Sequence, residues 1–139
     1  MPELHPEIVV DYPPNFKELS KRFAINPKAI YAWSPKIYNP AKRFVSTDLI
    51  EHEKVHITRQ DAMGGPQFWW EKYLDDAEFR LDEEARAYGR QFSYICTQNR
   101  DRNFQLRFLL GLANTLAGPM YGNITTTERA VELIKSMSK

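Results

Sequence analysis

One short pattern in the sequence has residue types and a spacing that suit metal-dependent chemistry: His52-Glu53-x-x-His56. Residues four apart lie on the same face of a helix, so both imidazoles can point at one ion. Zinc binds histidine nitrogen at about 2.0–2.1 Å, which requires such convergence. Glu53 can reach a water beside the ion and accept its proton. The pattern predicts a catalytic zinc site; the alternatives are a non-catalytic zinc site and two solvent-facing histidines.

A catalytic zinc site with an open position needs a third protein ligand. Between Leu81 and Ile95 the apolar residues step by three and four, which predicts one buried helical stripe. Glu84 falls inside or at the edge of that stripe, whereas Glu83 falls on the opposite face, which we expect to be solvated. A core-facing carboxylate is costly unless it is paired or binds a metal. Glu84 is therefore the predicted third ligand, Glu78 is the second choice, and a buried Glu–Arg pair is the alternative.

The helix that carries the two histidines must begin near one of three good N-cap residues, Ser46, Thr47 or Asp48, and we expect it to end near Gln60. Pro66 suits the first turn of a following helix, which carries a cluster of aromatic side chains predicted to be core. Capping patterns place the start of the Glu84 helix at Asp75 and the start of a last helix at Thr125.

Residues 1–28 are interrupted by prolines, and the run from Ile8 to Val10 suits an edge strand. A short helix is expected over residues 16–23. Residues 29–38 are β-branched and aromatic around Ser34-Pro35, which predicts a strand, a turn and a second strand. The fold class is accordingly α+β: a mostly helical domain with a small antiparallel sheet or hairpin packed on the metal-binding helix.

Two further helices are predicted in residues 100–139, separated by a loop that contains Tyr121. Tyrosines in such loops donate to oxyanions in several metallopeptidases, so Tyr121 is a candidate catalytic residue. The alternative is that Tyr121 serves only packing.

The bulk properties exclude several classes of protein. The chain has 139 residues, a net charge of +1, 42% hydrophobic residues and one cysteine. We expect one domain, residues 1–139, with no nucleic-acid partner, since the charge is nearly balanced. No apolar run is long enough to span a bilayer and no secretory signal is visible, which predicts a cytoplasmic or virion-associated protein. A single Cys96 excludes an internal disulfide framework.

The two motifs together resemble a known family. His52-Glu53-x-x-His56 followed by Glu84-x-x-Ala87-Tyr88 is similar to the gluzincin arrangement, in which a glutamate on the next long helix is the third zinc ligand. The spacing and small size resemble minigluzincins and the small zinc metallopeptidase-like proteins of phage and bacterial genomes. The resemblance covers residues 29–95, the expected metallopeptidase core of a zincin-like domain. Tyr88 stands where the family usually has aspartate, so no aspartate that orients a histidine is identified.

The resemblance implies zinc-dependent hydrolysis of peptide bonds in a peptide or protein substrate, with Glu53 as general base. It also implies that the edge strand before the metal helix, within residues 29–38, lies against the substrate; the alternative is an ordinary hairpin packed on the helix. The alternative is a catalytically silent protein of the same fold, such as a phage particle component with a protein partner. An open cleft favours the enzyme, and a plugged cleft favours the silent protein.

Overall fold

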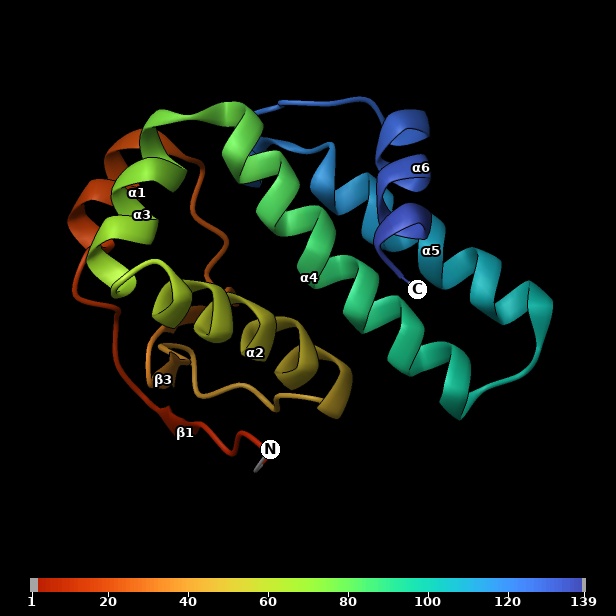
Figure 1. The fold of residues 1–139 in the computed structure, drawn as a ribbon, viewed down its shortest axis with the longest axis horizontal. Helices are drawn as coiled ribbons and strands as arrows, with labels where there is room; N and C mark the ends of the chain where they lie inside the picture. Colours follow the sequence, from red (N-terminus) through yellow and green to blue (C-terminus); the bar gives the residue numbers. More distant parts are fainter. Residues whose placement is uncertain (1–2, 139) are drawn as a thin grey trace.

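The computed structural model describes residues 3–138, and within them helices predominate over a small sheet (Figure 1). The predicted α+β class is confirmed at this level. In chain order the elements are β1 (Glu7–Val9), α1 (Phe16–Arg22), β2 (Tyr31–Trp33), β3 (Lys36–Tyr38), α2 (Thr47–Ala62), α3 (Pro66–Asp75), α4 (Ala77–Gln98), α5 (Arg102–Leu116), the 3₁₀ turn η1 (Pro119–Tyr121) and α6 (Thr127–Met137). None of the helices in these residues is both long and apolar enough to cross a membrane.

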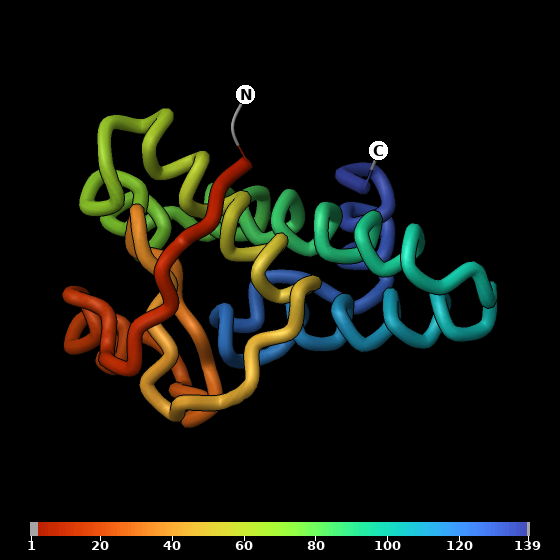
Figure 2. Tube along the Cα trace, turned by 90° about the horizontal axis from the view of Figure 1, so that it is seen from below, coloured from red at the N-terminus to blue at the C-terminus, as the bar shows by residue number. Residues whose placement is uncertain are grey.

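The sheet has three short strands in the order β1-β3-β2. The predicted hairpin is confirmed, because β2 and β3 pair antiparallel around Ser34-Pro35. The predicted antiparallel sheet is wrong in one respect: β1 adds to the other side of β3 in parallel, which makes the sheet mixed. Figure 2 shows this N-terminal segment running alongside the hairpin. Ala32 and Ile37 of the hairpin pack on Ile57 of α2, so the sheet lies on the helix that carries the histidines.

The long helix α4 is the centre of the helical part of the molecule. It packs against α2 and α3 on one side and against α5 and α6 on the other (Figure 1). At Gly89 the backbones of α4 and α6 approach so closely that an added Cβ would lie 2.7 Å from Met137. A side chain at position 89 would therefore push the two helices apart.

The helix starts differ by one residue from the predicted capping residues at two places. Asp76, not Asp75, caps α4 and accepts a hydrogen bond from the backbone N–H three residues on, at 3.0 Å. Thr126, not Thr125, caps α6 in the same way at 3.2 Å. In both cases the capping residue is the one with extended backbone, which lets its side chain turn back to the free N–H groups of the first turn.

The main core lies between α3, α4, α5 and α6. Trp69, Trp70 and Tyr73 of α3 are buried in it, which confirms the predicted aromatic core, whereas Phe68 is 59% exposed. The buried aromatic rings lie directly beside the helix face that carries His56, with the Trp69 and His56 rings 5.0 Å apart between centroids. The core is therefore continuous with the region of the predicted metal site.

Candidate metal centre

The two histidines of α2 lie side by side and are buried. His52 is 6% exposed and His56 is 4% exposed, and their rings lie 4.9 Å apart between centroids. Ser46 occupies the N-cap position and α2 extends to Ala62, so the expected helix is confirmed with two further residues at its end. His52, Glu53 and His56 each offer a donor atom within 4.8 Å of the others, and this buried group could bind a metal ion.

Glu84 of α4 joins the same cluster. One carboxylate oxygen, Oε1, lies 3.2 Å from Nε2 of His52 and 3.2 Å from Nε2 of His56. Donors placed tetrahedrally at zinc bond lengths are separated by about 3.3 Å, so these distances fit a shared ion. The other oxygen, Oε2, accepts a hydrogen bond of 2.6 Å from the Tyr73 hydroxyl. Glu78, the second choice as ligand, is exposed on the first turn of α4.

The charge state of Glu84 follows from its neighbours. Burial alone would raise the pKa of this carboxyl group, but the charge of His56 and the hydrogen bonds from His52 and His56 hold the pKa far below its ordinary value. Burial and the Glu84 charge raise the pKa of Tyr73 well above its usual value. Tyr73 therefore remains a neutral hydroxyl that donates to an ionised carboxylate.

Glu53 lies in the same group but in a different environment. The residue is 5% exposed, and within residues 3–138 its Oε2 atom has no hydrogen-bond partner. Burial, with the nearby Glu84 charge adding to it, raises the pKa of Glu53 to about 8, although His52 opposes the shift. A carboxylate with an unsatisfied buried oxygen is costly, which is characteristic of functional sites. In its ionised form Glu53 can act as a proton acceptor.

Two side chains in series, Gln91 and Asp48, support the Nδ1 side of the His52 ring. Its Nδ1 atom lies 3.0 Å from Oε1 of Gln91, and Nε2 of Gln91 donates to Asp48 at 2.8 Å. An ionised aspartate only accepts, so the Gln91 amide must present its oxygen to His52, which then carries its proton on Nδ1. As a neutral ring, His52 then has at Nε2 the lone pair that a metal needs, in place of the hydrogen bond that Nε2 donates to Glu84. Sequence reasoning missed this arrangement, although Gln91 follows Glu84 by seven residues and so lies near the same face of α4.

Glu83 is not solvated, so this prediction is wrong. The residue is 1% exposed and forms an ion pair of 2.9 Å with Arg59 of α2. It also accepts a 2.7 Å hydrogen bond from the Trp69 indole, whose ring packs on His56. The prediction for Glu83 assumed that α4 has only one buried face, whereas α2 and α3 cover a second side of this helix. Glu83 thus ties three helices together beside the metal cluster.

Tyr121 lies in the turn η1 and lines the same cavity as the two histidines. It is 8% exposed, and its hydroxyl lies 2.7 Å from that of Tyr88. Burial, together with the charge of Glu84, raises the pKa of Tyr121 well above its usual value, so the hydroxyl stays protonated and can donate. Its predicted role as an oxyanion donor stays a prediction.

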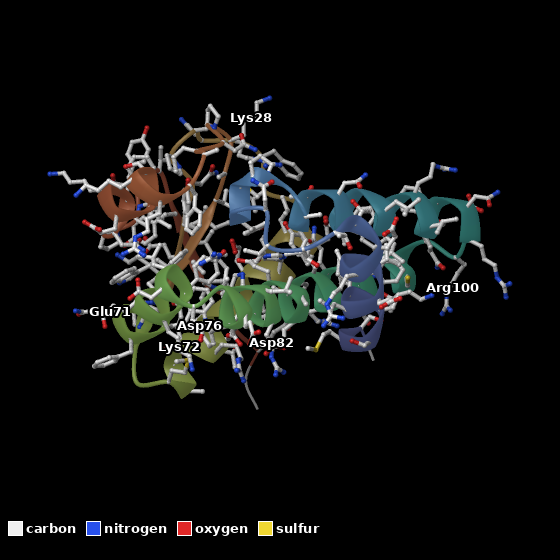
Figure 3. All side chains as sticks on the ribbon, turned by 90° about the horizontal axis from the view of Figure 1, so that it is seen from above. Lys28, Glu71, Lys72, Asp76, Asp82 and Arg100 are labelled. Atoms are coloured by element: carbon white, nitrogen blue, oxygen red, sulfur yellow. The ribbon has the colours of Figure 1, made fainter. Side chains whose placement is uncertain are left out.

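The cavity next to the cluster has a volume of about 270 Å³. His52, Glu53, His56 and Glu84 line it together with residues 23–26 and 28–32, the end of α5 and η1. Lys28, which lies on the rim, stands out at the surface of the loop before β2 (Figure 3). The cavity gives the cluster a space that a small ligand can fill.

No protein-family model matches the chain, and neither the curated proteins nor the solved structures include a match.

Proposed function

We propose that this protein is a zinc-dependent hydrolase of peptide bonds with a gluzincin-like, zincin-type site. One observation carries the proposal: two histidine nitrogens, four residues apart on one helix, lie 3.2 Å from the same glutamate oxygen. The cluster also borders a cavity and a buried Glu53 oxygen without a partner. A structural site would have no need of Glu53, since a closed tetrahedral site is complete with four protein ligands.

Zinc is the metal that the donor set favours. Two imidazole nitrogens and one carboxylate oxygen form the three-ligand set of zinc hydrolases, with one position open. Magnesium and calcium prefer sites made of oxygen alone. When bound, zinc supplies Lewis acidity at a peptide carbonyl and lowers the pKa of water.

The residues around the metal position have separable roles. Glu53 accepts the proton of the attacking water and passes it to the leaving amine. Gln91 fixes the proton of His52 on Nδ1, and Tyr73 fixes the orientation of the Glu84 carboxylate. Tyr121, neutral and next to the cavity, donates a hydrogen bond to the oxygen that becomes negative during attack.

The test compares Glu53→Gln with the wild type. Glutamine keeps the shape of the side chain but cannot take a proton, so we expect hydrolysis of a quenched fluorescent peptide library to be abolished while zinc remains bound at the wild-type stoichiometry. Glu71→Gln, at an exposed site on α3, is the matched control and should keep both properties. Turnover by Glu53→Gln at the wild-type rate would remove the proposed general base.

A second candidate is a protein that binds the metal without turnover, for instance a phage particle component with a protein partner. The burial of the donor residues favours this reading, since His52, Glu53, His56 and Glu84 are each at most 6% exposed. It predicts one zinc per chain, no hydrolysis of any peptide, and co-purification with assembled particles. Hydrolysis lost in Glu53→Gln would exclude it.

A further inference from the structure

The outer edge of β2 is closed by two side chains from the helices beside it. The Gln60 amide donates to the carbonyl of Ala32 at 2.9 Å and accepts from the backbone N–H of Ser34 at 2.7 Å. Trp70 donates its indole N–H to the same Ala32 carbonyl at 2.9 Å. A carbonyl oxygen has two lone pairs, so that of Ala32 is fully used. Gln60 thus bonds to this edge as a residue of a neighbouring strand would.

The two side chains that close this edge, Gln60 and Trp70, are a fixed part of the fold. Gln60 is fully buried and Trp70 is 7% exposed, and both lie next to the core. A peptide strand that displaced them would leave two buried amide or indole groups without partners, at a cost of about 1–3 kcal/mol each. An extended substrate can therefore not pair with β2 beyond Ala32.

The remaining part of this edge faces a small cavity. Residues 29–32 line the cavity of about 270 Å³, which also contains the metal cluster. Ligand pockets have volumes of about 300–1,000 Å³, so this cavity is at the lower end of that range and can enclose only a few residues of a peptide. Phe23, Asn26 and Lys28, from the chain before β2, also line this cavity.

The walls of this cavity are mainly apolar. Phe23, Ile30, Leu49, Leu112 and Met120 all contribute to them. The two carboxylates on the cavity surface belong to the metal cluster: Glu53 groups with the two histidines, and Glu84 contacts both of them. An apolar side chain beside the reacting bond is thus the group that the space would bury favourably.

We propose that the site accepts short apolar peptides or the end of a peptide chain, and excludes the interior of an extended chain. This inference rests on the proposed function for the identity of the reaction, but the size limit follows from the capped strand and the cavity. Cleavage then releases small fragments from a peptide terminus instead of cutting a protein in the middle.

The experiment measures binding to the zinc-loaded Glu53→Gln protein by calorimetry, so no turnover is needed. One probe is the tripeptide Ala-Leu-Leu, and the other embeds the same three residues in the middle of a Gly-Ser peptide that is acetylated and amidated at its ends. We expect the tripeptide to bind at least about tenfold more tightly, which corresponds to about 1.4 kcal/mol. Ala-Asp-Asp, the polar control of equal length, should bind more weakly than Ala-Leu-Leu.

Equal or tighter binding of the blocked long peptide would overturn the size limit, as would failure of Ala-Leu-Leu to bind. Hydrolysis by the wild type is followed separately by mass spectrometry on the same two peptides. If the tripeptide binds selectively but the wild type cleaves neither peptide, the proposed function fails and the size limit stands. Cleavage inside the blocked peptide at the tripeptide rate would refute the size limit and support the hydrolase.

Discussion

Replacing Gln91 with leucine should weaken zinc binding although residue 91 does not touch the ion. Gln91 accepts from Nδ1 of His52 at 3.0 Å and donates to Asp48 at 2.8 Å. Leucine fills a similar space but offers neither hydrogen bond. His52 then loses the partner that keeps the proton of its neutral ring on Nδ1 and so leaves Nε2 free to bind the metal.

The magnitude follows from the position of Gln91 in the site. It is 3% exposed, so water does not readily replace its amide at His52. Loss of a hydrogen-bond partner behind a metal-binding histidine typically costs about 10–100-fold in metal affinity, or about 1.4–2.8 kcal/mol. Asp48→Asn should cost less, because the asparagine amide can donate as well as accept and lets the Gln91 amide rotate between two orientations.

The assay is a competition for zinc between the protein and a chromophoric chelator near neutral pH. Gln98→Leu is the matched control, since Gln98 is an exposed glutamine at the end of the same helix. Circular dichroism of each metal-free variant checks that the fold is intact. Wild-type zinc affinity in a folded Gln91→Leu protein would refute the assignment of Gln91 as the residue that positions His52.

Three further outcomes are expected. Without metal, the pKa of Glu53 is higher in the folded than in the unfolded state, so the folded state is favoured while Glu53 is protonated. The free energy of unfolding should therefore be highest below about pH 4.5 and should fall as the pH rises to about 8. Urea unfolding with chelator present should show that Glu53→Gln avoids this fall and exceeds the wild type in free energy of unfolding by up to about 5 kcal/mol. Gly89→Ala should destabilise the fold by about 1–3 kcal/mol, seen as a lower melting temperature, because the new Cβ meets Met137 at 2.7 Å; an unchanged melting temperature would contradict the close packing of α4 on α6. Tyr121→Phe should lower kcat about 10²–10³-fold with zinc retained if its hydroxyl stabilises the oxyanion, whereas loss of the 2.7 Å contact with Tyr88 alone would leave kcat unchanged.

The sequence by itself determined those features that depend on periodicity along one helix. The four-residue spacing of His52 and His56 places them on one face of α2, and the stripe of α4 places Glu84 on a buried side. Both are local consequences of 3.6 residues per turn, which need no knowledge of the rest of the chain. The hairpin around Ser34-Pro35 was predictable for the same reason, since turn residues between β-prone runs are a local signal.

Tertiary structure alone decided which residues support the site. Glu83 is buried because α2 and α3 cover a second side of α4, which no single-helix pattern can indicate. The pairing of Asp48 with Gln91 joins residues 43 positions apart, and Gln60 reaches Ala32 across 28. Such contacts depend on how separate elements pack against one another, so their hydrogen bonds leave no spacing in the sequence by which to find them.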